Sequence, residues 1–259
     1  MNKEIFNEKK WVVIAGPCAA ENRNQILESA TEIKKAGGDI LRAGIWKPRT
    51  NPDTWQGAGD IAIDWMIEAR KNTGMPISTE VKDIRTIDIA LRANFDLLWI
   101  GSRNAQNYAL LEEIGKQTND KKIPIILKRG FSSSLDEWIG SMEYIYKNNP
   151  NVILCERGIR GFSPDTRNIL DLQTAYLAKQ QSGLPVVIDV SHAAGRSDLI
   201  TPMAVAAKAV GFDGLMVEVH PTPATAKTDS KQQISFNDFN NLIETLNRMP
   251  DSQTIYGKK

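Results

Sequence analysis

The sequence has few cysteines and histidines, no long apolar run and almost no net charge. Its two cysteines, Cys18 and Cys155, are too few for a disulfide framework and are expected to stay reduced. No apolar run approaches the roughly 18 residues that span a membrane, and the N-terminus shows no basic, apolar and small-residue signal pattern. We therefore expect a cytoplasmic protein that has no membrane partner.

The charge and glycine patterns exclude further classes of function. A net charge of +1 is too small for the general positive field of a nucleic-acid-binding protein, so no nucleic-acid partner is expected. A glycine-rich phosphate loop of the Walker or dinucleotide type is also missing, so nucleotide cofactors are not expected. Any function that depends on charge must therefore come from a local cluster of residues.

Short runs rich in Val, Ile and Leu alternate with stretches of helical spacing along the whole chain. This alternation is typical of parallel βαβ units. The expected strands cover residues 11–18, 39–44, 76–81, 97–101, 124–130, 152–158, 185–192 and 214–220. Apolar stripes at helical spacing predict helices that include residues 24–36, 135–147 and 236–246.

These units predict one α/β domain, a single (β/α)8 TIM barrel over residues 11–248, because their composition does not shift along the chain. An open doubly wound sheet is the structural alternative. Residues 1–10 are expected to form an N-terminal extension and residues 249–259 a polar C-terminal tail, both of them frayed.

Nearly every predicted strand ends in a polar residue, which is where a barrel of this kind builds its active site. A buried charge needs a partner or a ligand, because removing its water without one costs several kcal/mol. Taken singly, such residues often cap strand ends in water, whereas the whole set indicates a site. In strand order the set is Cys18, Arg42, Glu80, Arg103, Lys128, Glu156 with Arg157, His192, and Glu218 with His220.

Basic residues gather at the ends of the second, fourth, fifth and sixth strands. Segments 42–50, 101–104, 128–130 and 156–160 together hold eight basic residues and one acidic residue. Arginine forks and lysine ammonium groups that converge on one mouth are suited to phosphate or carboxylate ligands. Their spread over four strands predicts a ligand set with more than one anionic group.

The seventh, eighth and first strands are neighbours in a closed barrel and bring different chemistry together. They carry Cys18, His192 and Glu218, and Asp229 lies in the loop after the eighth strand. A thiolate, an imidazole and carboxylates from neighbouring strand ends could hold a divalent metal ion, and this mixture of ligands does not select one metal. Two alternatives stay open, because a cysteine after Gly-Pro is often only a small buried residue and because His220 could be packed outside the site.

The remaining cysteine and most tryptophans are interpreted as packing residues. Cys155 lies inside a hydrophobic strand, and large aromatic side chains usually supply core area. The tryptophans in this group are Trp11, Trp65, Trp99 and Trp138.

With these residues laid out, the sequence resembles the 3-deoxy-D-arabino-heptulosonate 7-phosphate (DAHP) synthases, in particular their short type I-beta subgroup. The matching stretches occur in the family order between residues 15 and 229. They are AGPC (15–18), LRAG (41–44), KPRT (47–50) with WQG (55–57), STEV (78–81), IGSRN (100–104), LKRG (127–130), CERG (155–158), DVSH (189–192) and EVHP (218–221). Val190 stands where many relatives have proline and Ser102 where alanine is usual, and neither change removes a functional group.

The resemblance implies a metal-dependent transferase, a 3-deoxy-7-phosphoheptulonate synthase. It would condense phosphoenolpyruvate with erythrose 4-phosphate and water, the first step of the shikimate pathway to chorismate and the aromatic amino acids. The implied phosphoenolpyruvate ligands are Arg42, Lys47, Glu80, Arg103, Lys128 and Arg157. The implied erythrose 4-phosphate ligands are Lys47, Pro48, Arg49, Thr50 and Asp229. The implied metal ligands are Cys18, His192, Glu218 and Asp229. Lys47, Cys18 and His192 are the residues expected to be catalytic.

The resemblance also sets expectations for cofactor and partners. The expected metal is Mn²⁺, with Fe²⁺, Co²⁺ or Zn²⁺ as alternatives. A homo-oligomer, either a dimer or a tetramer, is expected. Some relatives carry a regulatory or chorismate mutase domain, so a chorismate mutase domain outside this chain is a further candidate partner.

Three alternatives, two of them other functions and one another mechanism, compete with this expectation. A related synthase uses arabinose 5-phosphate to make an eight-carbon sugar acid, but it typically has a Lys-Ala-Asn-Arg-Ser type of sequence where residues 47–50 here are KPRT. Lys128 could in principle form an imine, as lysines do in other barrel aldolases, although phosphoenolpyruvate already carries the enol. A non-catalytic phosphosugar-binding subunit is the third, and nothing in the sequence favours it because the basic residues and the presumed metal ligands are intact.

Overall fold

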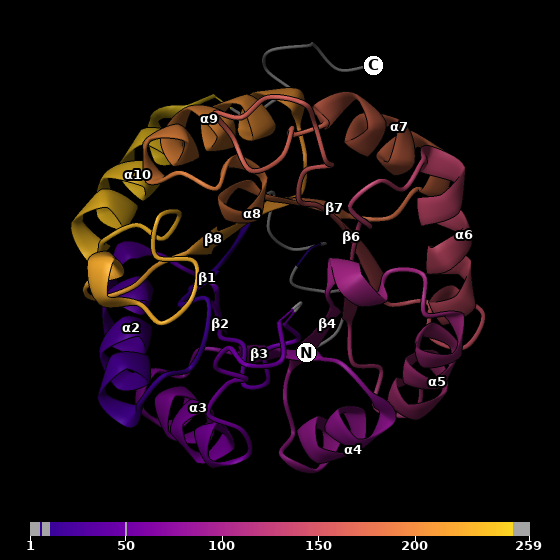
Figure 1. The fold of residues 1–259 in the computed structure, drawn as a ribbon, viewed down its shortest axis with the longest axis horizontal. Helices are drawn as coiled ribbons and strands as arrows, with labels where there is room; N and C mark the ends of the chain where they lie inside the picture. The colour runs from indigo at the N-terminus through magenta and orange to yellow at the C-terminus, as the bar shows by residue number, and fades with distance from the viewer. Residues whose placement is uncertain (1–5, 7–10, 50, 251–259) are drawn as a thin grey trace.

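The computed structural model describes residue 6 and residues 11–49 and 51–250. Within this part of the chain, eight parallel strands close into a barrel in sequence order, and the first strand pairs with the last (Figure 1). Helices surround the strands on the outside. The prediction of a single (β/α)8 barrel is confirmed, and the open doubly wound sheet is excluded because the sheet has no edge.

Each strand lies inside the run predicted for it. The strands are β1 (Val12–Gly16), β2 (Ile40–Arg42), β3 (Ile77–Val81), β4 (Leu97–Ile100), β5 (Ile125–Lys128), β6 (Val152–Glu156), β7 (Val186–Asp189) and β8 (Gly214–Glu218). The outer helices are α2 (Arg23–Ala36), α3 (Ile61–Thr73), α4 (Ile84–Arg92), α5 (Tyr108–Thr118), α6 (Leu135–Tyr146), α7 (Leu172–Ser182), α9 (Ile200–Val210) and α10 (Phe236–Arg248). A short helix, α8 (Val190–Ala194), follows β7 directly.

The seventh strand is shorter than predicted. It ends at Asp189, and the Asp189 carboxylate accepts a hydrogen bond of 3.0 Å from the backbone N–H of His192, as an N-cap does. His192 therefore lies on α8 instead of on the strand. The Asp189 side chain thus satisfies a backbone N–H in the first turn of α8, which favours a helix over a longer strand here.

Local sequence signals explain where the outer helices begin and end. Helix α6 begins at a capping box in which Ser134 and Glu137 each bond the other's backbone N–H. Helix α2 ends at Gly37, whose φ of 103° is the left-handed conformation that favours glycine. These signals account for the start of α6 and the end of α2.

The core has two layers, one inside the barrel and one between the strands and the helices. The inner layer contains Trp99 and Cys155, and the outer layer contains Trp138. Trp11 and Trp65 are partly buried against the outer layer. The interpretation of these five residues as packing residues is confirmed, although Trp99 also has a second role described below.

The described residues include Phe6 of the expected N-terminal extension and residues 249–250 of the expected C-terminal tail. Residues 1–5, 7–10 and 251–259 lie outside the described residues. Phe6 does not fit the expectation of a frayed extension, because it is buried in the inner layer beside Val12 and Ile14. Met249 likewise packs partly against the outer layer.

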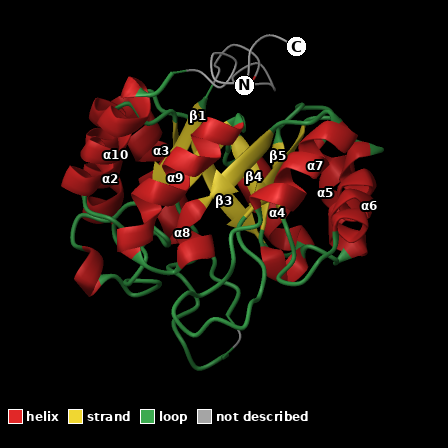
Figure 2. Ribbon diagram, turned by 90° about the horizontal axis from the view of Figure 1, so that it is seen from above, coloured by secondary structure: helices red, strands yellow, loops and turns green. Residues whose placement is uncertain are grey.

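Figure 2 shows the strands enclosed by helices, with the longer loops gathered at the end of the barrel where α8 lies. This is the end at which the strands finish, so residues at the ends of all eight strands lie around one mouth. Across residues 6, 11–49 and 51–250, no helix combines the length and apolar character that crossing a bilayer requires.

Candidate active site

A cavity of about 260 Å³ opens at the mouth of the barrel and is lined mainly by charged side chains. Its basic residues are Arg42, Lys47, Arg49, Arg103, Lys128, Arg157 and Arg167, and its acidic residues are Glu80 and Asp229. Pro48 and His192 also line it, and Thr50 lies outside the described residues. The surplus of basic groups suits the cavity to ligands with more than one anionic group.

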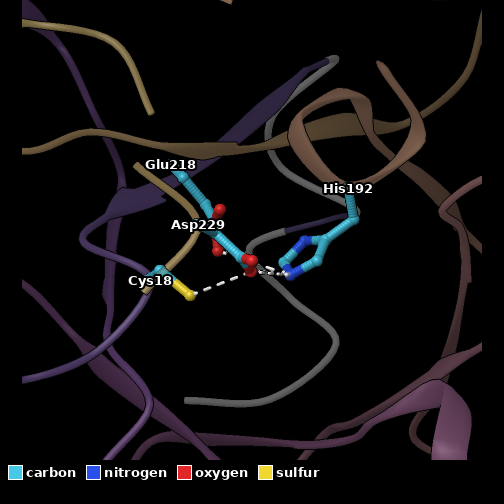
Figure 3. Close-up of side chains that lie close together, drawn as sticks. All are labelled: Cys18, His192, Glu218 and Asp229. Atoms are coloured by element: carbon cyan, nitrogen blue, oxygen red, sulfur yellow. Dashed lines mark hydrogen bonds and ion pairs between the residues drawn. The ribbon is translucent and has the colours of Figure 1, made fainter. Parts of the chain in front are cut away.

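Four possible metal ligands meet at one side of this cavity. They are Cys18 after β1, His192 on α8, Glu218 at the end of β8 and Asp229 in the next loop, and their ligand atoms lie within 4.8 Å of one another. Figure 3 shows the four side chains pointing toward a common centre. We name these four residues the ligand cluster.

The spacing of the ligand cluster fits a metal ion. Asp229 Oδ2 lies 3.4 Å from Cys18 Sγ and 3.8 Å from His192 Nε2, and Glu218 Oε1 lies 3.4 Å from His192 Nε2. Tetrahedral bonds of about 2.0–2.3 Å would place ligands roughly 3.3–3.8 Å apart. Cys18 is fully buried, as the packing alternative expected, but its sulfur faces the cluster.

The Cys18 thiol depends on nearby charge for its ionisation. Burial, with a smaller contribution from Glu218, raises the pKa of Cys18 to about 12, although Lys47 opposes this shift. The Lys47 ammonium lies 3.1 Å from Cys18 Sγ and donates to the Cys18 carbonyl at 3.2 Å. A bound cation would displace the thiol proton, since metals bind the thiolate.

The orientation of His192 is fixed by its neighbour on β7. His192 Nδ1 lies 2.8 Å from Asp189 Oδ2, which leaves Nε2 facing the ligand cluster. Burial lowers the pKa of His192 despite the nearby carboxylates, and a neutral imidazole is the form that binds metals. Burial works against ionisation of Asp189, yet His192 and Lys128 hold the pKa of Asp189 well below its usual range.

Two of the cavity's cations rest on Trp99. The Arg42 guanidinium lies 4.8 Å and Lys128 Nζ 5.6 Å from the centre of its ring. Both cations also have anionic partners, because Arg42 is 3.2 Å from Glu218 and Lys128 is 2.5 Å from Asp189. Trp99 therefore forms the floor of the cavity as well as packing in the barrel.

A second aromatic ring organises the opposite side of the mouth. The guanidinium groups of Arg157, Arg160 and Arg103 lie 4.8, 5.4 and 5.6 Å from the centre of the Phe131 ring. Arg157 is 3% exposed, and burial lowers its pKa. Among the described residues, no carboxylate forms an ion pair with Arg157. A buried arginine of this kind is ready to receive an anionic ligand.

Some strand-end residues do not reach the cavity. Arg129 points away from it, bonds Glu156 at 3.0 Å and Asp171 at 2.9 Å, and stacks on Trp138. Glu156 is fully buried in this pairing. Glu156 and Arg129 therefore pair outside the cavity, whereas Glu80 lines the cavity.

His220 lies outside the ligand cluster, as its alternative interpretation expected. Its Nδ1 accepts a hydrogen bond of 3.0 Å from the backbone N–H of Thr222. Its Nε2 lies 3.7 Å from Glu21 Oε1. His220 is buried and has its contacts outside the ligand cluster.

Sequence reasoning missed several residues that shape the site. The spacing of Asp189 three residues before His192 is a cap signal that could have found it. The other missed residues lie in loops, except Trp99, which was interpreted only as a packing residue. No periodic pattern in the sequence identifies them as site residues. They are Trp99, Phe131, Arg167, Gln232 and Gln233.

Comparisons with known proteins identify relatives of this chain. A family model described as the DAHP synthetase I family matches residues 3–253. A phospho-2-dehydro-3-deoxyheptonate aldolase from Thermotoga maritima is 40% identical over 244 residues, which cover 93% of this chain and 70% of that protein. A 2-dehydro-3-deoxyphosphooctonate aldolase from Caulobacter vibrioides is 28% identical over 267 residues, which cover 94% of this chain and 89% of that protein.

Two solved structures share the fold over almost the whole chain. The crystal structure of the Thermotoga maritima phospho-2-dehydro-3-deoxyheptonate aldolase, a DAHP synthase, matches with a TM-score of 0.87 at 39% identity, covering 92% of this chain and 68% of that one. A truncated form of the 3-deoxy-D-arabino-heptulosonate 7-phosphate synthase from Thermotoga maritima matches with a TM-score of 0.83 at 37% identity, covering 92% and 86%.

Proposed function

The chain belongs to the DAHP synthetase I family, and from this premise we propose that it condenses phosphoenolpyruvate with erythrose 4-phosphate and water. The products are DAHP and inorganic phosphate. The observation that carries the proposal is a single cavity in which a surplus of basic side chains adjoins the ligand cluster. We expect this reaction to be the first step of the shikimate pathway and to take place in the cytoplasm.

Phosphoenolpyruvate would occupy the part of the cavity between Trp99 and Phe131. Its phosphate and carboxylate carry charges that match the cations on these two rings. In this proposal its ligands are Arg42, Lys47, Glu80, Arg103, Lys128 and Arg157, all of which line the cavity.

Erythrose 4-phosphate would bind nearer the loop after β2. Arg49 lines the cavity there, and its Nε donates to Thr54 Oγ1 at 3.2 Å, which holds the guanidinium in place. We assign Arg49 to the phosphate of this substrate, together with its sequence neighbours Pro48 and Thr50. Lys47 and Asp229 are assigned to the rest of the substrate. Two anionic substrates held in one cavity gain rate from proximity.

The chemistry joins C3 of phosphoenolpyruvate to the aldehyde carbon. Water then adds at C2, and phosphate leaves by cleavage of its bond to that carbon. When bound by the ligand cluster, a divalent metal ion would polarise the aldehyde oxygen as a Lewis acid. We propose Mn²⁺ for this role, with Fe²⁺, Co²⁺ or Zn²⁺ as alternatives, because thiolate, imidazole and carboxylate ligands do not select one metal.

Lys47 is the proposed proton donor to the aldehyde oxygen as it becomes a hydroxyl. Burial would lower the pKa of Lys47, but Cys18, Glu80 and Glu218 outweigh burial and raise it. The side chain therefore carries its proton at neutral pH. Its Nζ lies beside Cys18 Sγ, at the edge of the ligand cluster, where a proton can pass to an oxygen held there.

Lys128 fits an imine-forming role poorly. Its Nζ is buried and pairs with Asp189 at 2.5 Å, and a lysine must lose its proton before it can attack a carbonyl. Borohydride trapping of substrate on Lys128, together with full activity in a chelator, would reverse this assignment.

A phosphate-release assay tests the proposal against its competitors. Turnover should favour erythrose 4-phosphate over arabinose 5-phosphate, stop in a chelator and return with Mn²⁺. A preference for the five-carbon sugar would support the eight-carbon synthase instead. Calorimetric binding of phosphoenolpyruvate to Mn²⁺-loaded protein without any turnover would support a phosphosugar-binding subunit.

We further propose that the chain forms a dimer or tetramer, a proposal that rests on family resemblance. Analytical ultracentrifugation of the protein would give its mass in solution. The same experiment with an added chorismate mutase tests whether that enzyme is a partner.

A further inference from the structure

The two carboxylates of the ligand cluster share one pattern, in which one oxygen faces the cluster and the other is held from outside. Asp229 Oδ2 faces Cys18 and His192, whereas Asp229 Oδ1 lies 3.3 Å from Arg167 Nη1. Glu218 Oε1 faces His192 and also accepts a hydrogen bond of 3.2 Å from Arg42 Nη1, whereas Glu218 Oε2 accepts a hydrogen bond of 2.6 Å from Gln232 Nε2. The outward oxygens therefore already have partners.

Those two partners also bond each other. Arg167 Nη1 donates to Gln232 Oε1 at 2.9 Å. The guanidinium and the amide thus form a continuous bridge from Asp229 to Glu218, around the outside of the ligand cluster. We name Arg167 and Gln232 the carboxylate bridge.

The surrounding backbone holds both members of the carboxylate bridge. The Gln232 N–H donates to the Asp229 carbonyl at 3.1 Å, in a turn where Asp229 has a φ of 52°. The Arg167 N–H donates to the Ala194 carbonyl at the end of α8. The Arg167 side chain lies against Gly195, where an added Cβ would come within 2.4 Å of it. The loop of Arg167 is thereby tied to the helix that carries His192.

We propose that Arg167 and Gln232 are positioning residues that hold Asp229 and Glu218 with one oxygen each toward the metal ion. This inference rests on the proposed metal centre. A carboxylate whose second oxygen is already bonded does not rotate to chelate with both oxygens or to turn away. The site therefore loses less freedom when the ion binds, and its affinity rises.

A direct role in substrate binding is the competing explanation for Arg167, because its side chain is 35% exposed and lines the cavity. In that case Arg167 would leave Asp229 for a substrate phosphate. Metal affinity without substrate separates the two roles. Loss of the carboxylate bridge should weaken Mn²⁺ binding, whereas loss of the Arg167 charge alone would strengthen it by removing repulsion.

The experiment compares Arg167→Met and Gln232→Met with Arg196→Met in chelator-stripped protein. Methionine keeps the unbranched aliphatic stem and removes the polar bonds. Arg196 is the control because its side chain is exposed, pairs with Asp198 and donates to the Asp165 carbonyl at 3.5 Å, with no bond to the ligand cluster among the described residues. The dissociation constant for Mn²⁺ alone, from electron paramagnetic resonance of the free ion, should rise roughly 10- to 100-fold in the two bridge variants. The control should stay within about twofold of the unaltered protein.

The outcomes distinguish this inference from the proposed function. If the unaltered protein binds no Mn²⁺, both this inference and the proposed metal-dependent function fail. If it binds Mn²⁺ and the two bridge variants bind it equally well, only the carboxylate bridge fails. Unchanged Mn²⁺ affinity with weakened phosphoenolpyruvate binding in Arg167→Met would make Arg167 a substrate ligand, which also overturns the inference.

Thermal unfolding in chelator provides the second readout. The bridge variants should melt close to Arg196→Met without metal, and saturating Mn²⁺ should then stabilise them less than the control. Gln232 is buried, so its variant could fold poorly. Arg167→Met alters a partly exposed side chain and keeps the inference testable in that event. A large drop in the metal-free melting temperature of Arg167→Met would show a role in the fold and overturn it.

Discussion

The two sides of the barrel mouth handle charge in opposite ways. On the side of β7, β8 and β1, the members of the ligand cluster already contact partners within the protein. On the side of β4 to β6, arginines gather around Phe131, and the buried Arg157 has no ion pair among the described residues. The first side is organised before any ligand arrives, whereas the second holds positive charge that an anionic substrate would neutralise.

Three cations join the two sides. Arg42 contacts Glu218, Lys47 contacts Cys18, and Lys128 contacts Asp189, while all three line the common cavity. A change on one side is therefore expected to reach the other through contacts of this kind. The following variants test that division.

The largest expected effect is that of Cys18→Ala, which removes a proposed metal ligand. Activity should fall roughly 10³-fold, because Lewis-acid stabilisation is worth several kcal/mol. Phosphoenolpyruvate binding should survive in part, because the arginines around Phe131 are untouched. Steady-state kinetics with metal analysis checks this. Cys155→Ala, in the inner core, should keep its metal, and wild-type activity of Cys18→Ala in saturating Mn²⁺ contradicts the division.

Asp189→Asn should cost about 3 kcal/mol of unfolding free energy, since it leaves the buried Lys128 without its anionic partner. Urea unfolding in chelator measures this loss. Asp198→Asn breaks only an exposed pair with Arg196 and serves as the control. A loss below about 1 kcal/mol would mean that Asp189 does not link the two sides.

Arg49→Ala should raise the Michaelis constant for erythrose 4-phosphate without changing metal content. Loss of a charged fork to one phosphate costs about 2–3 kcal/mol, or roughly 30- to 150-fold. Initial rates at varied aldehyde concentration, with Arg85→Ala as an exposed control, test this expectation. Loss of metal from Arg49→Ala would show that the two sides are not separate.

Phe131→Leu should have the smallest effect, because it removes only the ring on which three arginines rest. Phosphoenolpyruvate affinity should fall about fivefold, near 1 kcal/mol, with unchanged Mn²⁺ affinity. Calorimetry with both ligands measures the two effects. Phe162→Leu is the matched control, since that ring is fully exposed. Equal phosphoenolpyruvate affinity in both variants would remove Phe131 from the anion-binding side.

The sequence predicted the fold well because the alternation of buried strands and helices follows from local patterns. Eight strands with polar ends leave few arrangements other than a closed parallel barrel. The early end of β7 was not predicted, because the Asp189 cap competes with a strand in a way that hydrophobicity does not show. The order of strands and helices can thus be predicted from local sequence patterns, whereas the end of β7 depends on a single side-chain hydrogen bond.

The residues that line the candidate cavity were predicted mainly where they stand at or shortly after strand ends. Lys128 and Arg129 are adjacent, yet one lines the cavity and the other bonds Glu156 outside it. The alternation of side chains along a strand could have separated them. Arg167 and Gln232 could not be found this way, because their loops are placed by contacts with α8 and the ligand cluster. Loop side chains depend on tertiary contacts that no spacing in the sequence records.

The pairing of β1 with β8 has a consequence for how the protein acquires its site. Cys18 and Asp229 stand 211 positions apart, and Cys18 and Gln233 stand 215 apart. Contacts of such long range form late, because a large loop must close before they contribute. A growing chain on the ribosome therefore has no ligand cluster until its last barrel strand and the loop after it have emerged. A metal ion bound there would link the first and last βα units. The contact that closes the barrel and the proposed metal site therefore lie at the same place.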